Sequence, residues 1–339
     1  MTDSSRRLQQ RAALVLGVLA LFALAALVLS GMTGSVTIPL ADMPAALGAV
    51  LRGETPTLAA TLLELRGQRA LAAFITGASL SLAGVMMQAL LRNPLADPYV
   101  LGISAGASVG ALAALMLMCA AWMVDAAAFG GALAISLLLY LLARRDLGDG
   151  AAAGGVATLL LTGVILSSAC MALVTLMLSI APDSRLRSMV FWLIGDLAGA
   201  PLRAMPCVVL AAALIFAVKQ ARAVNVMVLH AEAAATLGIR VGALRRGLFL
   251  VAALLTASAV TTAGSIGFVG LIVPHACRFA LGPDHRLLIP AATLAGGAYL
   301  MLADTLARTV IAPEQLPVGV ITALVGAPVF LYQLHRLRK

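Results

Sequence analysis

The chain has 339 residues, of which 62% are apolar and 11% are charged, and its mean hydropathy is +1.05. A soluble domain carries about a quarter charged residues, so this composition excludes an ordinary soluble protein and indicates an all-α polytopic membrane protein. The net charge of +9 lies in loops and termini, and two tryptophans with few lysines give no surface for reading nucleic-acid bases. We therefore expect membrane lipid as a partner and no nucleic acid.

Nine apolar segments follow one another along the chain, and a membrane-spanning helix needs roughly 20 apolar residues. The first segment, 12–30, follows a basic tail of residues 1–11 and shows no clear cleavage site, so we expect a spanning helix and not a signal peptide. The other segments contain no Asp, Glu, Lys or Arg: 70–91, 99–124, 126–143, 151–182, 204–218, 247–276, 287–303 and 315–335. The run 247–276 is too long for one helix, and we divide it near Gly264, which gives ten spans.

The distribution of basic residues tests this count. With ten spans and the N-terminus inside, 16 of the 23 basic residues fall in inner segments and 7 in outer ones. The positive-inside rule therefore places both termini in the cytoplasm. We predict one transmembrane domain over residues 12–335, flanked by a cytoplasmic tail of residues 1–11 and a short basic C-terminus, 336–339.

The chain shows no source of energy of its own. Ion-driven carriers keep titratable groups near the midplane of the membrane, yet the predicted spans have no charged residue in their middles. Its lysines, Lys219 and Lys339, are not followed by Ser or Thr, so there is no phosphate-binding P-loop. Energy must come from another polypeptide, or the protein is a passive channel or stand-alone carrier.

Residues that could catalyse a reaction or bind a metal are sparse. The four cysteines lie singly in apolar runs without a CxxC pair, and the four histidines show no HExxH spacing. His275 follows Pro274 within a predicted helix, where we expect a structural role. The sequence thus predicts neither an enzyme nor a metal or cofactor site.

The segment 65–111 combines small residues with a tight turn. Gly77, Ser81 and Gly84 allow close approach of neighbouring helices, and the NPLADP sequence at 93–98 predicts a turn before the next span. Ser104 and Ser108 then lie on a helix face of small residues. Because its side chains are small, that face could line a passage. Small side chains suit close packing between helices equally well.

Residues 231–238, AEAAATLG, have the pattern of a short helix in water between two apolar runs. Ala and Leu favour a helix, Glu232 lies near its positive end, and Gly238 predicts its stop. The alternative is a helix lying on the membrane, but Leu237 is nearly alone as an apolar anchor. We expect this helix to contact a soluble partner that moves it. Further on, Asp304 and Arg308 are four residues apart and can pair on one helical face.

Four motifs in this order and spacing resemble the permeases of type II ABC importers that take up iron-siderophores, haem and cobalamin. They are QALLRNPLADPYVLGISAGASVGA, EAAATLG, GFVGLIVPH and LPVGVITALVGAP, and the likeness runs from about residue 65 to 334. It implies a homodimer of ten-helix subunits in a bacterial inner membrane, with two cytoplasmic ABC ATPases and a periplasmic substrate-binding protein.

The resemblance also assigns roles to residues. It implies that residues of the 231–238 helix couple to the ATPase, that arginines on the outer side receive acidic residues of the binding protein, and that the turn after Arg92 narrows the path at its cytoplasmic end. The coupling residues are Glu232, Ala233, Leu237 and Gly238; the docking arginines are Arg66, Arg69 and Arg308; and the gate residues are Asn93 and Leu95.

One motif departs from the family. Members commonly have Arg-Leu-Pro-Arg at the first docking site, whereas this chain has Arg-Gly-Gln-Arg at 66–69. Both charges are kept without the rigid proline. The weakly polar walls of the predicted path suit a bulky chelate, but they do not distinguish siderophore, haem and cobalamin.

Overall fold

The computed structural model describes residues 3–148, 155–229 and 231–337, and every regular element in these ranges is a helix. The elements in chain order are α1 Asp3–Met32, α2 Met43–Leu51, α3 Leu58–Leu90, the 3-10 helix η1 Pro98–Leu101, α4 Ile103–Met116, α5 Ala121–Ala143, α6 Gly155–Ile180, α7 Asp183–Ile194, α8 Ala204–Leu229, α9 Ala231–Thr236, α10 Val241–Ala263, α11 Val269–Leu281, α12 His285–Thr309 and α13 Val318–Leu337.

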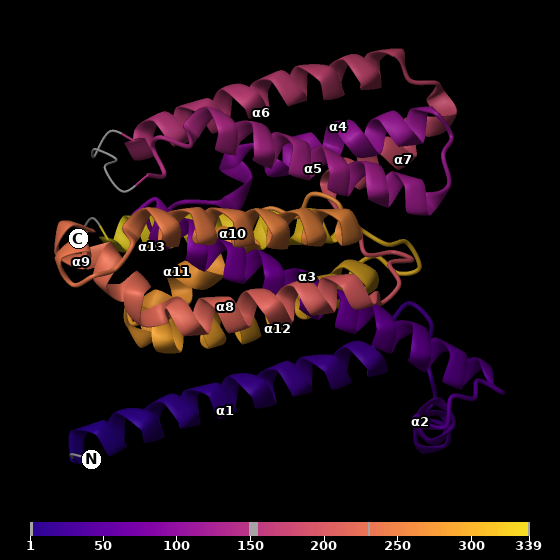
Figure 1. The fold of residues 1–339 in the computed structure, drawn as a ribbon. Coiled ribbons are helices and arrows are strands. Elements are labelled where there is room, and N and C mark those ends of the chain that lie inside the picture. The colour runs from indigo at the N-terminus through magenta and orange to yellow at the C-terminus, as the bar shows by residue number, and fades with distance from the viewer. Residues whose placement is uncertain (1–2, 149–154, 230, 338–339) are drawn as a thin grey trace.

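Within the described ranges, seven helices are long and apolar enough to cross a membrane, namely α1, α3, α5, α6, α8, α10 and α12. Three shorter apolar helices, α4, α11 and α13, lie in the remaining predicted segments. The chain is therefore a multi-pass membrane protein. The start of α1 and the end of α13 lie at the same end of the bundle as α9 (Figure 1). We call this the α9 end, and the opposite end, which carries α2 and α7, the α2 end.

Helix α3 forms the centre of the bundle, with 83% of its most apolar window buried. Its small residues permit this, because a Cβ atom at Gly77 would overlap the carbonyl oxygen of Gly296 in α12, and one at Gly84 that of Gly270 in α11. Ser81 Oγ donates to Ala292 O at 2.7 Å in the same interface. The predicted close approach at these three residues is confirmed.

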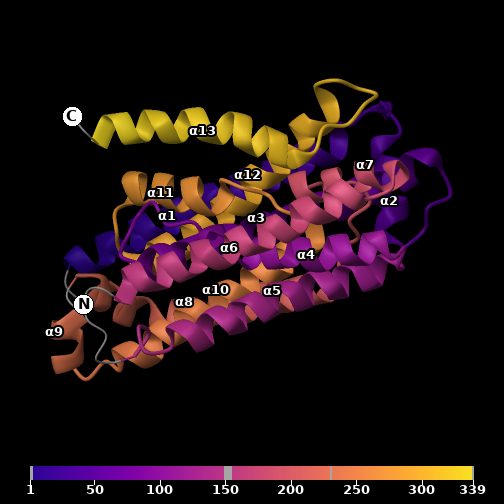
Figure 2. The ribbon, with the colours of Figure 1, turned by 90° about the horizontal axis from the view of Figure 1, so that it is seen from above.

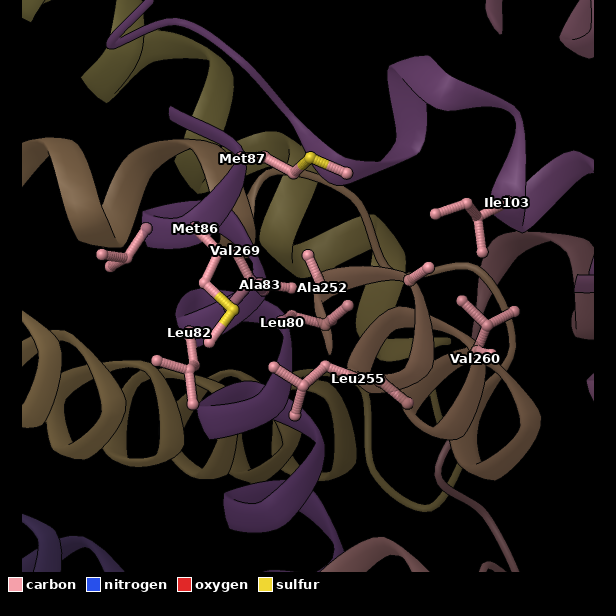
Figure 3. Packing of buried hydrophobic residues seen from close by; sticks show 14 of the residues in the cluster. Leu80, Leu82, Ala83, Met86, Met87, Ile103, Ala252, Leu255, Val260 and Val269 are labelled. Atoms are coloured by element: carbon pink, nitrogen blue, oxygen red, sulfur yellow. The ribbon is translucent and has the colours of Figure 1, made fainter. Parts of the chain in front are cut away.

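The apolar core continues from α3 into the helices around it. Figure 3 shows Leu80 and Met86 of α3 packed close to Leu255 of α10 and Val269 of α11. A second group of helices, α4 to α6, lies against this core (Figure 1). By contrast, only 11% of the most apolar window of α1 is buried, so α1 is a peripheral helix.

The long run 247–276 is divided as predicted. Helix α10 ends at Ala263, Gly264 has a φ of +68°, and α11 begins at Val269. The linking residues are held by η1 and α4, since Ile266 N donates to the hydroxyl of Tyr99 and Ser265 Oγ lies 2.8 Å from Ser104 Oγ. A positive φ suits glycine, which explains why the chain turns at this position.

Two features of the sequence prediction need correction. The predicted boundary near residue 125 is wrong, because α4 ends at Met116 and α5 begins at Ala121. Asp125 can lie inside α5 because its carboxylate pairs with Arg203 at 2.5 Å, so a charge there does not end the helix. Helices α2 and α7 were not predicted either. Pro182 precedes α7 and Asp183 begins it, which is a usual helix start.

Candidate functional site

Three arginines that are far apart in sequence converge at the α2 end. Arg66 and Arg69 lie on α3, and Arg308 lies in the last turn of α12. All three line one cavity of about 400 Å³, together with Gln68 and Gln315. The structure therefore brings together in one cavity the three arginines to which the family resemblance assigned a docking role.

Asp304 holds two of these arginines in place. It is fully buried, and both of its oxygens accept from Arg69 Nε at 3.0 Å, while Arg69 Nη2 donates to Oδ1 at 2.8 Å. Arg308 Nε lies 3.1 Å from the other oxygen, which confirms the predicted Asp304–Arg308 pair. Arg69 also donates to Gln315 Oε1 at 2.9 Å. One carboxylate thus fixes guanidinium groups from two helices in a forked geometry.

Arg66 and Arg308 also bind the C-terminal end of α1. The last carbonyls of a helix have no partner within the helix. Here Arg66 Nη1 donates to Gly31 O and Met32 O, both at 3.3 Å, and its Nη2 donates to Val36 O. Arg308 Nη2 donates to Ser30 Oγ at 2.8 Å and to Ser30 O at 3.3 Å. The two arginines therefore cap α1, and cations at this position complement the negative end of the helix dipole.

The electrostatics of this cavity favour an anion. Three guanidinium groups surround it, and in the described chain Asp304 is the carboxylate that pairs with them. Arg66 and Arg308 are only 7% and 4% exposed, while the Arg69 side chain reaches 12%. An added carboxylate would meet uncompensated positive charge, but it would have to compete with bonds that these arginines already make.

Sequence reasoning missed part of this site. It found Asp304 as the partner of Arg308 through their spacing of four residues, but not as the partner of Arg69, 235 residues away. Ser30 and Gln315 were missed completely. No local signal marks them, because they become relevant only when α1, α3 and α12 meet.

The predicted coupling segment forms a helix at the opposite end. Helix α9 covers Ala231–Thr236, Gly238 has a φ of +79°, and the N–H of Gly238 donates to Ala235 O at 3.0 Å. This is the stop expected of glycine after a helix. Leu237 is 70% exposed, whereas the side chains of Glu232 and Ala233 lie outside the part of the chain that the structure describes.

The predicted gate turn follows α3 at the same end. Asn93 is exposed, and its Oδ1 accepts from Leu95 N at 2.9 Å, which stabilises the turn. Leu95 is 38% exposed. Asp97 then caps η1 by accepting from Tyr99 N at 2.8 Å. Burial raises the pKa of Asp97 to about 6, although the hydrogen bond from Tyr99 N opposes this rise.

Ser104 and Ser108 pack against neighbouring helices in the part of the chain that the structure describes. Both are buried, and Ser104 Oγ lies beside Ser265 Oγ, while Ser108 Oγ donates to Ser104 O at 3.0 Å. On the same helix, Gly106 packs against Gly131 of α5. This arrangement fits the packing role that the sequence left open, and a place for Ser104 and Ser108 along the path stays a prediction.

Comparison with known proteins identifies the family of the chain. The model of the FecCD transport family matches residues 21–336. The chain belongs to the FecCD transport family. Among curated relatives of this FecCD chain are a cobalamin import system permease of Halobacterium salinarum, 44% identical over 76% of the chain and 69% of the relative, and a hemin transport system permease of Yersinia pestis, 39% identical over 82% and 84%.

A vitamin B12 import system permease of Escherichia coli is 38% identical over 81% of the FecCD chain and 84% of its own length. Among solved structures, a metal-chelate type ABC transporter in an inward-facing conformation matches with a TM-score of 0.81 and 27% identity, over 96% of this chain and 99% of that one. These relatives are transport permeases, which agrees with the absence of a P-loop from the sequence.

Proposed function

We propose that this chain is the membrane-spanning subunit of an ABC importer that moves a metal chelate (cobalamin, haem or an iron-siderophore) across a bacterial inner membrane. The observation that carries the proposal is the match to a metal-chelate type ABC transporter over 96% of the chain. Relatives named for cobalamin and hemin transport support this substrate class.

In this proposal ten helices cross the bilayer, both termini face the cytoplasm, and two copies form the path. The start of α1 and the end of α13 lie at the same end of the bundle as α9, which agrees with an even number of crossings (Figure 1). The α9 end then faces the cytoplasm, where two ATPases bind α9 through Glu232, Ala233, Leu237 and Gly238. Closure of the ATPases on ATP would move α9 and alternate access to the path, which Asn93 and Leu95 narrow.

The α2 end faces the periplasm and receives the substrate-binding protein. The positive cavity lined by Arg66, Arg69 and Arg308 supports docking of an acidic residue. Arg69 is the most exposed of the three and bonds the exposed Gln315, so we propose that it makes the first contact. Contact with Arg66 or Arg308 requires that each gives up carbonyl bonds to α1.

Reconstitution tests the proposal. The chain is placed in vesicles with its ATPase and binding protein, and chelate uptake and chelate-stimulated ATP hydrolysis are measured for cobalamin, haem and a ferric siderophore. Glu232→Arg should abolish uptake while membrane insertion stays normal, because it reverses a charge on the helix that contacts the ATPase. Asp146→Lys, a charge reversal at the same end but outside α9, is the matched control.

Two results would contradict the proposal in different ways. Full uptake by Glu232→Arg would refute the coupling role of α9. Chelate accumulation against a gradient by the chain alone, without ATPase, would favour the alternative of a stand-alone secondary transporter.

A further inference from the structure

A second cavity lies at the α9 end, and the proposed transport does not use it. It has a volume of about 450 Å³ and lies between the C-terminal ends of α3 and α8 and the connection from α11 to α12. A volume of this size falls in the range of small-molecule sites. The residues that line it fall into three chemical groups.

The first group consists of two buried hydrogen-bond acceptors. Gln88 and His285 line the cavity and are only 2% and 3% exposed, yet Gln88 Oε1 and His285 Nε2 have no hydrogen-bond partner in the described chain. The Gln88 amide is oriented by its Nε2, which donates to Leu271 O at 3.3 Å, so Oε1 is the free atom. A buried acceptor without a partner is costly, which favours a ligand that brings N–H or O–H donors.

The tautomer of His285 follows from its neighbours. Asn225 Nδ2 donates to Asp284 Oδ1 at 2.7 Å, so Asn225 Oδ1 faces His285 and accepts from its backbone N at 2.9 Å. His285 Nδ1 lies 2.7 Å from the same oxygen and must donate to it. A neutral imidazole with its proton on Nδ1 presents a lone pair at Nε2.

The second group consists of charges. Arg92 and Arg278 line the cavity, and their guanidinium groups make no hydrogen bond or ion pair within the described residues. Asp284 lies beside them. Burial raises the pKa of Asp284, but hydrogen bonds from Arg286 N and Asn225 together with nearby positive charge outweigh burial and leave the pKa below its ordinary value. The cavity therefore offers two free cations and one stable carboxylate.

The third group consists of apolar wall residues, and the cavity lies where membrane-spanning helices end. The apolar residues are Ala89, Pro94, Val228, Leu229 and Pro283. Helix α8, which forms one wall, lies on the opposite side of the bundle from α13 (Figure 2). Only 22% of the most apolar window of α8 is buried, so the rest of the described chain leaves much of this apolar helix uncovered.

We propose that this cavity binds the head group of a phospholipid that carries a primary ammonium and a phosphate, as in phosphatidylethanolamine. The ammonium donates to Gln88 Oε1, His285 Nε2 and the Asp284 carboxylate. The phosphate oxygens accept from Arg92 and Arg278, and the glycerol follows the apolar walls. A simple anion satisfies the arginines but leaves both buried acceptors unpaired, whereas a zwitterion satisfies both groups at once.

Native mass spectrometry of the full-length protein tests this site. Purified protein is exchanged into detergent with phosphatidylethanolamine, phosphatidylcholine or phosphatidylglycerol of identical acyl chains. Phosphatidylcholine keeps the phosphate and the charge but has no N–H donors, so it probes the buried acceptors without any mutation. We expect phosphatidylethanolamine to be retained at least about tenfold more strongly than phosphatidylcholine, because charge-assisted hydrogen bonds are lost in the latter.

Matched arginine variants test the phosphate contact. Arg278→Gln should lower retention of phosphatidylethanolamine about tenfold. Arg286→Gln should not lower it, since Arg286 is exposed in the first turn of α12 and does not line the cavity. Equal retention by the two variants would overturn the proposal.

Comparison of ligands separates a lipid from other occupants. Equal retention of phosphatidylcholine and phosphatidylethanolamine would show that the buried acceptors bind water and not an ammonium. Displacement of the lipid by soluble O-phosphoethanolamine at equal concentration would show that the site takes a free metabolite. Either result contradicts lipid binding, and neither depends on whether the chain is an importer subunit.

Discussion

The two ends of the bundle use buried polar groups in opposite ways. At the α2 end, Arg66, Arg69 and Arg308 find acceptors in Asp304 and in the last carbonyls of α1. At the α9 end, Gln88 Oε1 and His285 Nε2 are acceptors without a partner among the described residues. The first end is closed by bonds within the chain. The second leaves buried acceptors unpaired among the described residues, which favours a ligand that brings hydrogen-bond donors.

The largest expected effect is at Asp304. Asp304→Ala leaves Arg308 buried without its counter-ion, and breaking a buried pair in this way typically costs about 3–5 kcal/mol. We expect a large fall in the melting temperature of the purified protein, measured by thermal unfolding in detergent. Glu314→Ala removes an exposed carboxylate at the same end and serves as the control. Equal melting temperatures for the two variants would mean that the Asp304 cluster does not stabilise this end.

A smaller loss of stability is expected when the arginine cap of α1 is removed. Arg66→Met deletes hydrogen bonds to Gly31, Met32 and Val36 while keeping much of the side-chain volume. Leaving such carbonyls unpaired costs about 1–3 kcal/mol. Hydrogen exchange should become faster in residues 29–36 and stay unchanged in α3 beyond residue 70. The exposed Arg52→Met is the control, and unchanged exchange in 29–36 would contradict the cap.

Replacing a buried polar side chain by Met at the α9 end should not lower the stability of the protein, in contrast to Arg66→Met at the α2 end. Gln88→Met removes a buried acceptor that has no partner, together with weak bonds of 3.3 and 3.5 Å to carbonyls of α11. In detergent without added lipid we expect stability to be unchanged or to rise by up to about 1 kcal/mol. A loss as large as that of Arg66→Met would show that the two ends do not differ in this respect.

A further effect on stability is expected at Asp97, and it depends on pH. A carboxyl with a raised folded-state pKa favours folding below its ordinary value of 3.8, and that contribution is lost as the pH rises through about 6. Asp97→Asn keeps the acceptor for Tyr99 N but cannot ionise. Thermal unfolding should show the variant more stable by about 1–2 kcal/mol at pH 8 and nearly equal at pH 4. A difference that does not vary with pH would contradict this role.

The sequence predicts the helices better than the contacts between them. The bilayer sets the length of a span, so a long apolar run in the sequence shows where a helix lies. The break at Gly264 needs a positive φ, which glycine adopts readily, so a glycine in an overlong run shows where the helix stops. Helix α2 is apolar but has only nine residues, too few to span a membrane, and α7 mixes charged with apolar residues, so the search for long apolar runs does not reveal either helix. Asp125 shows the same limit, because only its distant partner Arg203 explains why α5 contains a charge.

For the candidate site too, some features could be predicted from the sequence and others could not. The family resemblance of the motifs points to Arg66, Arg69 and Arg308, and the structure brings these residues to one cavity, while their docking role stays a prediction. Their burial was not predictable, because it depends on the end of α1, which approaches from more than 30 residues away for Arg66 and more than 270 for Arg308. The cavity at the α9 end joins four helix ends, and no single segment signals it.

The arginine cap of α1 has a consequence for the order of synthesis. The carbonyl of Ser30 leaves the ribosome early, whereas its donor Arg308 is made 278 residues later, after most helices are complete. Until then the end of the first helix must rely on water or lipid head groups and on Arg66. A nascent chain that stops before α12 therefore lacks the Arg308 part of the α1 cap. In such an unfinished chain we expect the C-terminal end of α1 to be held less tightly and to be cleaved more readily by quality-control proteases.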